Sequence, residues 1–175
     1  MSSAVVYDNY LPKTYFKKLQ KWFFSSEPNW KYNQHKVKPT ESTDSFQFVH
    51  TLYRVAQPQK RKKAVHTDMG VIRPLLDHLQ PSILLKVKAN ITPRTAEPDK
   101  TDFHTDYPPI LNHSTGIIYF NTNNGYTEFE DGKIVESVAN RAVFFQGSER
   151  HRGGSCTDSK VRVVLNINFF PKILV

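Results

Sequence analysis

Near its carboxyl end the chain reads Lys160-Val-Arg-Val-Val-Leu-Asn-Ile-Asn-Phe-Phe170, a run with the alternation typical of a β-strand. In a strand, successive side chains point to opposite faces. One face of this run is apolar and consists of Val161, Val163, Leu165, Ile167 and Phe169. The other face carries Lys160, Arg162, Val164, Asn166 and Asn168. The run therefore predicts a strand with one face in a core, while its other face either meets water or lines a polar cavity.

The sequence before this run contains further short strand patterns. We expect strands over residues 83–90, 116–121, 126–130, 133–136 and 141–145. Asp131-Gly132 separates two of them and is a favoured two-residue hairpin turn. Many short strands with few helical patterns between them predict an antiparallel barrel or sandwich. The expected fold class is therefore mainly β.

Residues 1–82 are expected to support this core. Leu11, Phe16, Leu19 and Phe23 fall on one helical face, and Pro12 suits the first turn of that helix. A second helical stripe spans residues 71–79, and residues 30–34 and 45–53 have strand patterns. The length of 175 residues suits one domain. We therefore predict a single domain over residues 1–175, with a support region (1–82) and a β core (83–175).

Composition limits the class of protein. Hydrophobic residues make up 38% of the chain, which is enough to build a core. Lys and Arg exceed Asp and Glu by 24 − 16 = 8, and this surplus favours anionic partners, among them nucleic acid. The cationic run at residues 60–63 is either a solvated loop or a docking patch for an acidic partner.

The same composition predicts a soluble protein of the cytoplasm, or of the host cytoplasm if the protein is viral. No apolar run approaches the roughly 20 residues that a membrane helix needs. The first residues lack the layout of a signal peptide. The single cysteine, Cys156, excludes an internal disulfide and a cysteine-based zinc site.

The pattern His-Thr-Asp occurs twice, as His66-Thr67-Asp68 and as His104-Thr-Asp106. Residues two apart on a strand point to the same face, so an imidazole and a carboxylate at this spacing can hold one metal ion. The first copy directly precedes a helical pattern, where Thr67 or Asp68 would serve as the helix N-cap. The second copy lies among the short strands, and we expect it to lie on a strand itself. We therefore place the metal site at the second copy.

Two later residues extend this constellation. His151 follows Asp106 by 45 residues, and with His104 it completes a set of two histidines and one carboxylate, the ligand type of non-haem Fe(II) oxygenases. Arg162 lies on the polar face of the last strand, and a guanidinium binds a carboxylate through two parallel hydrogen bonds. An arginine beside an iron site suggests a dicarboxylate co-substrate. Lys160, on the same strand face, is the alternative anchor.

In this order of motifs the sequence resembles the Fe(II)/2-oxoglutarate-dependent oxygenases, in particular the prolyl 4-hydroxylase-like branch with its small phage-encoded members. The resemblance extends to Asp8-Asn-Tyr-Leu-Pro12, Phe46-Gln-Phe-Val-His50, Thr115-Gly-Ile-Ile-Tyr-Phe-Asn121, Glu128-Phe-Glu-Asp-Gly132 and Arg162-Val-Val-Leu-Asn-Ile-Asn-Phe-Phe170. It implies a double-stranded β-helix (jelly-roll) core with the N-terminal helices packed on one sheet.

The resemblance also implies roles for single residues. His104, Asp106 and His151 would be the iron ligands and form the catalytic centre, while Arg162 and Tyr119 would bind 2-oxoglutarate. The cofactors would be Fe(II), 2-oxoglutarate and O2, with ascorbate as a stimulant. His113 is expected to be an exposed loop residue and not a ligand.

The activity implied is hydroxylation of a C–H bond with release of succinate and CO2. The preferred substrate is a peptide or protein side chain, with proline as one candidate. Two alternatives stay open, namely oxidation of a nucleic-acid base and a jelly-roll binding module without chemistry. Base oxidation is suggested by the basic surplus, although it requires aromatic side chains around a flipped base.

Overall fold

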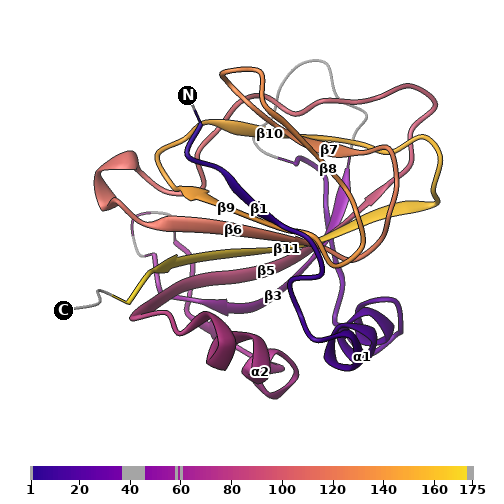
Figure 1. The fold of residues 1–175 in the computed structure, drawn as a ribbon. Coiled ribbons are helices and arrows are strands. Elements are labelled where there is room, and N and C mark those ends of the chain that lie inside the picture. Colours follow the sequence, from indigo (N-terminus) through magenta and orange to yellow (C-terminus); the bar gives the residue numbers. More distant parts are fainter. Residues whose placement is uncertain (1, 37–45, 58, 60, 173–175) are drawn as a thin grey trace.

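The computed structural model describes residues 2–36, 46–57, 59 and 61–172 (Figure 1). Its helices are α1 (Lys13–Phe23), α2 (Met69–Leu79) and a short 3-10 helix at Pro109–Leu111. Its strands are β1 (Val5–Tyr7), β2 (Lys31–Asn33), β3 (Gln47–Arg54), β4 (Val65–His66), β5 (Ile83–Pro93), β6 (Ser114–Tyr119), β7 (Tyr126–Phe129), β8 (Ile134–Glu136), β9 (Ala142–Gln146), β10 (His151–Gly154) and β11 (Val161–Phe170).

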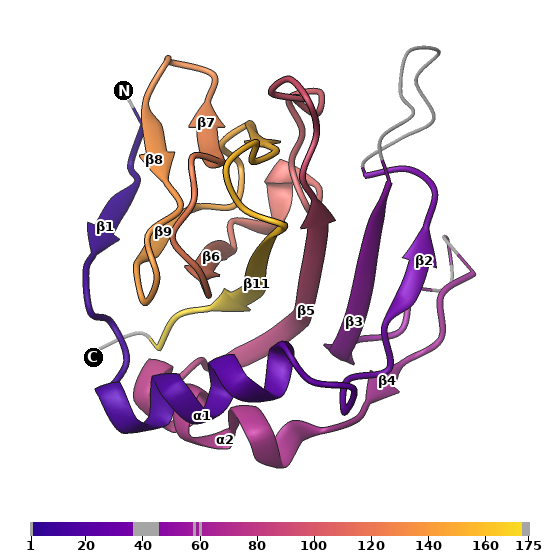
Figure 2. The ribbon, with the colours of Figure 1, turned by 90° about the vertical axis from the view of Figure 1, so that its right-hand side faces the viewer.

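The strands form two antiparallel sheets, and Figure 2 shows the smaller sheet lying across from the larger one. The larger sheet has the strand order β1-β9-β6-β11-β5-β3-β2, with β4 added to β3, and the smaller sheet has the order β10-β7-β8. Strand β11, which the opening sequence run predicted, pairs with both β5 and β6 and lies in the interior of the larger sheet. This arrangement confirms the mainly β jelly-roll prediction.

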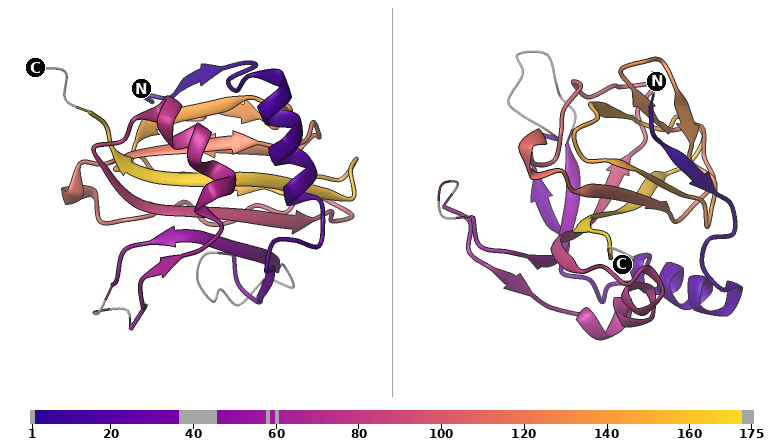
Figure 3. Two further views of the ribbon diagram at one scale, coloured as in Figure 1. Left: turned by 90° about the horizontal axis from the view of Figure 1, so that it is seen from below. Right: turned by 60° about the vertical axis from the view of Figure 1, so that its left-hand side comes forward.

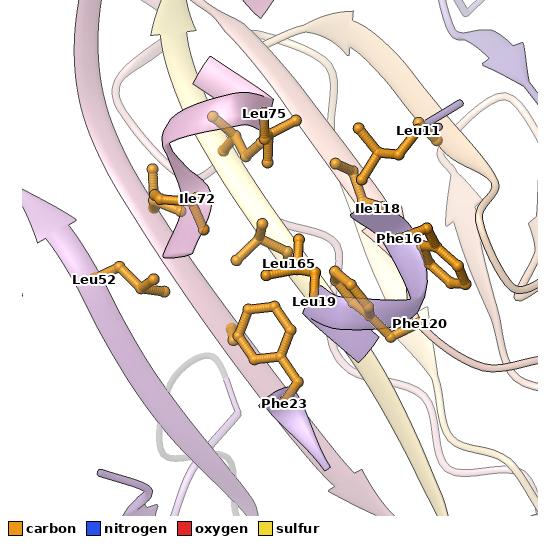
Figure 4. Close-up of a cluster of buried hydrophobic side chains, with 14 of the residues drawn as sticks. Leu11, Phe16, Leu19, Phe23, Leu52, Ile72, Leu75, Ile118, Phe120 and Leu165 are labelled. Atoms are coloured by element: carbon orange, nitrogen blue, oxygen red, sulfur yellow. The ribbon is translucent and has the colours of Figure 1, made fainter. Parts of the chain in front are cut away.

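The two helices cover one face of the larger sheet (Figure 3, left). The buried residues of α1 are Phe16, Leu19 and Phe23, whose spacing of three and four places them on one side of the helix. Phe23 packs against Phe120 with ring centroids 4.7 Å apart, and Leu165 of β11 belongs to the same cluster (Figure 4). Burial of each such side chain stabilises the fold by about 1.5–3 kcal/mol. Neither helix of the described residues is long and apolar enough to cross a membrane.

The hairpin between β7 and β8 differs in one detail from its prediction. The register pairs Glu128 with Ile134, and the Phe129 N–H donates to the Lys133 carbonyl over 2.9 Å. The loop therefore contains three residues and not two. Gly132, the last of them, has a φ of 89°, a conformation that glycine adopts without strain.

Several elements were not predicted. Strands β1, β4 and β10 are two to four residues long, which is too short for a periodic pattern to be recognised. The prediction of a strand at His104–Asp106 was wrong, because only His104 forms a single antiparallel bridge, with His151. This bridge nevertheless joins the two histidines of the predicted metal site.

Candidate metal and co-substrate site

A polar pocket lies between the two sheets. The described residues that line it come from β5, β11, β10, β7, β6 and the segment before β6, with Gln47 of β3 and Lys36 of the segment before β3. They are Lys36, Gln47, Lys88, Asn90, Thr92, Thr101, His104, Asp106, Ile117, Thr127, His151, Arg152, Gly153, Gly154, Ser155, Arg162, Val164 and Asn166. Arg162, Val164 and Asn166 of the polar face of β11 thus line a cavity, which decides between the two sequence-based alternatives.

Two imidazoles stand side by side in this pocket. The backbones of His104 and His151 exchange two hydrogen bonds of 3.0 Å, and their ring centroids are 4.8 Å apart. His151, on β10, is buried, and its ring also contacts Phe145 with centroids 4.8 Å apart. A β-bridge between residues 47 positions apart therefore brings the two histidines together.

Hydrogen bonding defines which ring nitrogen of each histidine is free. Nδ1 of His104 lies 3.0 Å from the Asp102 carbonyl oxygen, and Nδ1 of His151 lies 3.2 Å from the Glu149 carbonyl oxygen. Because a carbonyl oxygen can only accept, both Nδ1 atoms carry a proton, which leaves Nε2 as the lone-pair nitrogen of each ring in its neutral form. Burial lowers the pKa of His151, which favours the neutral ring. Metal-binding histidines commonly have this arrangement.

Asp106 supplies a carboxylate to the same pocket. Its two oxygens accept from Lys86 Nζ at 3.0 Å and from Asn168 Nδ2 at 2.9 Å. Burial alone opposes ionisation of this group, but the charges of Lys86 and Lys88 and the hydrogen bond from Asn168 help to outweigh it. The pKa of Asp106 is therefore held well below its usual range, and the carboxylate is charged at neutral pH.

The donor set is suited to a divalent transition metal, although its members are not yet arranged as a coordination shell. Among the described residues, no three His, Cys, Asp or Glu side chains stand together in metal-binding geometry. At this site the carboxylate of Asp106 is hydrogen-bonded to Lys86 and Asn168. Two imidazole lone pairs and one carboxylate in a single pocket nevertheless fit Fe(II) in chemical type.

Arg162 lies in the same pocket and has no acidic partner among the residues that the structure describes. The residue is 6% exposed. Its Nε donates to Ser137 Oγ at 2.8 Å, and its Nη2 donates to Thr127 Oγ1 at 3.2 Å. Burial lowers its pKa, since the charged form loses water contacts. A buried cation bound only to neutral hydroxyls is costly, and an anionic ligand would relieve that cost.

A glycine makes room for this arginine. A Cβ at Gly125 would lie 2.7 Å from Arg162 Cδ and 3.0 Å from the Gly154 carbonyl oxygen, so no other residue fits there without displacement. Tyr119 lies beneath the guanidinium, whose carbon is 5.5 Å from the ring centroid. Its hydroxyl donates to Thr127 at 2.8 Å, and burial raises its pKa. Tyr119 thus contacts Arg162, whereas the pocket lining itself does not include it.

The remaining sequence candidates lie elsewhere. Lys160 is exposed and does not line the pocket. The prediction that His113 is exposed was wrong, because this loop residue is fully buried and its ring packs against Gly147. Residues 58 and 60 of the basic loop lie outside the described residues, which leaves the docking-patch alternative as a prediction.

The first His-Thr-Asp copy does not join the pocket. Asp68 is the N-cap residue of α2, as predicted, but its side chain does not make the expected capping hydrogen bond. Its carboxylate instead lies 3.1 Å from Nε2 of the buried His50. His66 pairs with Tyr53 at the edge of the larger sheet. This copy therefore has a structural environment, as expected from its position before a helix.

Sequence analysis missed several polar residues of the pocket. Lys86 and Asn168 bind Asp106, and Thr127 and Ser137 bind Arg162. The only signal was the alternation of Lys86, Lys88 and Asn90 with apolar residues on one strand. That pattern is the same for a solvated face and for a face that lines a cavity.

Comparison with solved structures supports the fold. No protein-family model matches the sequence, and no match was found among curated proteins. An oxidoreductase of the 2OG-Fe(II) oxygenase family from Burkholderia pseudomallei superposes with a TM-score of 0.63 at 10% identity, covering 95% of this chain and 84% of that one. A prolyl hydroxylase from Trichoplax adhaerens, in complex with a hypoxia inducible factor peptide fragment, gives 0.62 at 12% identity, covering 98% and 84%.

A third neighbour is the epimerase SnoN in complex with Fe3+, alpha ketoglutarate and nogalamycin RO. Its TM-score is 0.61 at 10% identity, covering 97% of this chain and 79% of that one. The chain thus has the fold of 2OG-Fe(II) oxygenases, prolyl hydroxylases among them, as the sequence resemblance predicted. Whether it resembles phage-encoded members in particular stays a prediction.

Proposed function

We propose that the protein is an Fe(II)- and 2-oxoglutarate-dependent dioxygenase. In this proposal His104, Asp106 and His151 hold the iron, and Arg162 binds the far carboxylate of 2-oxoglutarate, with Tyr119 beside it. The fold shared with 2OG-Fe(II) oxygenases supports the proposal. The pocket supports it independently, because these side chains come from distant segments and all but Tyr119 line the same cavity.

One observation carries the proposal. The buried Arg162 guanidinium has no acidic partner among the described residues. It shares its pocket with two imidazoles whose Nε2 atoms can donate an electron pair to a metal ion. A purely structural jelly roll gains nothing from an unpaired buried cation, since such a group destabilises the folded state. A ligand with a carboxylate at one end and metal-binding oxygens at the other satisfies both features.

The protein side chains perform positioning and charge placement in this scheme. Fe(II), when bound, supplies the redox chemistry that couples decarboxylation of 2-oxoglutarate to oxidation of a substrate C–H bond, with succinate and CO2 as products. The Asp102 and Glu149 carbonyls orient the two imidazoles through Nδ1. Lys86 and Asn168 keep Asp106 ionised. Selectivity then depends on which C–H bond the pocket mouth holds in reach.

We propose a peptide or protein side chain as the substrate, with proline as one candidate. The Trichoplax neighbour, which contains a peptide fragment, supports this choice by analogy of fold. The net charge of +8 is the feature that favours the alternative, a nucleic-acid base. Ascorbate is expected to stimulate turnover.

Anaerobic titration tests the proposed class. Purified protein is incubated with Fe(II) and then with 2-oxoglutarate, and the visible charge-transfer band of the iron chelate is recorded. We expect the band to develop with the protein and to be absent from its His151→Ala variant. If iron saturates the protein and no band develops, the protein is a binding module and the proposal is wrong. Succinate release against peptide and oligonucleotide libraries then separates the two substrate classes.

A further inference from the structure

Lys88 is a cation of the pocket wall that forms no ion pair with a described residue, although the Asp106 carboxylate, which is paired with Lys86, acts on it electrostatically. Three other cations that line or border the pocket each have a carboxylate partner, as Lys36–Asp99 at 2.7 Å, Lys86–Asp106 at 3.0 Å and Arg152–Glu128 at 2.9 Å. Lys88 lines the same pocket and is partly buried, and it makes neither an ion pair nor a hydrogen bond to a described residue. Apart from Arg162, it is thus the pocket cation still available to an anion.

The register of two central strands places Lys88 along the pocket. Strand β5 pairs with β11 so that Thr92 faces Arg162, Asn90 faces Val164, Lys88 faces Asn166 and Lys86 faces Asn168. Each of these pairs points into the pocket side of the sheet, because all members are two residues apart. Asp106 is bound by the last pair, Lys86 and Asn168. The Lys88 row therefore lies between the Arg162 row and the row that holds Asp106.

A co-substrate that spans from Arg162 toward the metal ligands must pass over this row. Arg162 and Asn166 are four residues apart, which corresponds to about 13 Å along the strand. The long side chains of Arg162 and Lys88 both project from the sheet and can incline toward each other. An extended five-carbon diacid with an ionic contact at each end suits such a pair of cations.

We propose that Lys88 binds the carboxylate that adjoins the keto group of the 2-oxo acid, opposite the carboxylate bound by Arg162. This inference rests on the proposed function. It assigns Lys88 a positioning role, namely to hold the metal-proximal end of the co-substrate. Burial, reinforced by the charge of Lys86 and only partly offset by the Asp106 carboxylate, lowers the pKa of Lys88 to about 8. The charged form of Lys88 is thus disfavoured without an anion and gains from binding one.

Binding of two 2-oxo acids distinguishes the two cations. 2-Oxoglutarate has both carboxylates, whereas 2-oxovalerate has only the one next to the keto group. Calorimetry on the Mn(II)-loaded protein measures both affinities for the wild type, Lys88→Met, Lys88→Arg and Arg162→Met. Lys21→Met, which changes an exposed lysine of α1, is the control.

We expect Lys88→Met to weaken the binding of both acids by a similar factor of roughly 10- to 100-fold, because the variant loses one hydrogen bond between charged groups. Arg162→Met should weaken 2-oxoglutarate only, Lys88→Arg should retain most of the affinity, and Lys21→Met should change neither. Since methionine removes an unpaired partly buried charge, the melting temperature of Lys88→Met should not fall. The Mn(II) affinity of this variant should also match the wild type.

Several results would overturn the role of Lys88. Unchanged affinity of Lys88→Met for both acids would exclude it from co-substrate binding. A loss confined to 2-oxoglutarate would place Lys88 at the far carboxylate, and a parallel loss of Mn(II) affinity would mean that it acts on the metal ligands. If the wild type itself binds neither acid, the proposed function is wrong. If the wild type binds 2-oxoglutarate and only the Lys88→Met results differ from expectation, the role of Lys88 alone is wrong.

Discussion

Replacement of Arg162 by methionine gives the sharpest test of the pocket. The substitution keeps an unbranched apolar side chain, but it removes the guanidinium, which lies over the Tyr119 ring. A carboxylate held by two charge-assisted hydrogen bonds loses about 1.5–3 kcal/mol for each, so the loss is at least about 3 kcal/mol. The dissociation constant for 2-oxoglutarate should therefore rise by at least about 100-fold.

Stability should change little in the same variant. The substitution removes two hydrogen bonds, to Ser137 and Thr127, but it also removes a buried cation that has no acidic partner among the described residues. These two effects have opposite signs. Urea unfolding of the metal-free protein measures the net difference and shows whether the variant is folded for the binding assay.

The assay is calorimetric titration of 2-oxoglutarate into the Mn(II)-loaded protein, with Mn(II) affinity measured separately. Lys160→Met is the matched control, because Lys160 lies two residues away but is exposed and outside the pocket. We expect Arg162→Met to lose 2-oxoglutarate affinity while Mn(II) affinity is retained. Equal losses of both affinities, or the same loss in Lys160→Met, would refute the assignment of Arg162 as the anchor.

Three further predictions concern the metal site, the packing and the pH dependence of stability. His151→Ala should abolish retention of Fe(II) measured after desalting, whereas His66→Ala should not; equal loss would mean that the wrong His-Thr-Asp copy was chosen. A methyl group at Gly147 would lie 2.2 Å from a buried imidazole, so Gly147→Ala should lower the free energy of unfolding by about 1–3 kcal/mol. At Gly70 nothing lies within 4 Å of an added methyl group, so Gly70→Ala should raise the free energy of unfolding by about 0.5–1 kcal/mol. If urea unfolding shows Gly147→Ala to be the more stable of the two variants, the packing described is contradicted. The Arg152 guanidinium donates hydrogen bonds to Glu128 and holds the pKa of the Glu128 carboxyl below its usual range. The contribution of this pair is therefore present at neutral pH and is lost as the pH falls through the lowered pKa. The stability deficit of Glu128→Gln should shrink toward acid pH, and a constant deficit would show that the ion pair contributes nothing.

Long periodic segments were predictable because their side chains repeat a simple environment. The alternation around Leu165 predicted β11, and the spacing of Phe16, Leu19 and Phe23 predicted α1. Strands too short to show a repeating pattern of side chains were missed, among them β10, which carries His151. His113 was misjudged for a related reason, since its burial depends on Gly147, which is distant in sequence.

The sequence by itself determined the chemistry available to this protein: a mainly β chain with two histidines, an aspartate and an arginine in an order that resembles iron oxygenases. Only the tertiary structure decided that the polar face of β11 lines a pocket, because a strand face has the same alternation whether it meets water or a second sheet. The β-bridge between His104 and His151 and the lack of an ion pair from Arg162 or Lys88 to a described residue also depend on contacts between distant segments. Such contacts leave no local signal, since they arise from the closure of two sheets over one cavity.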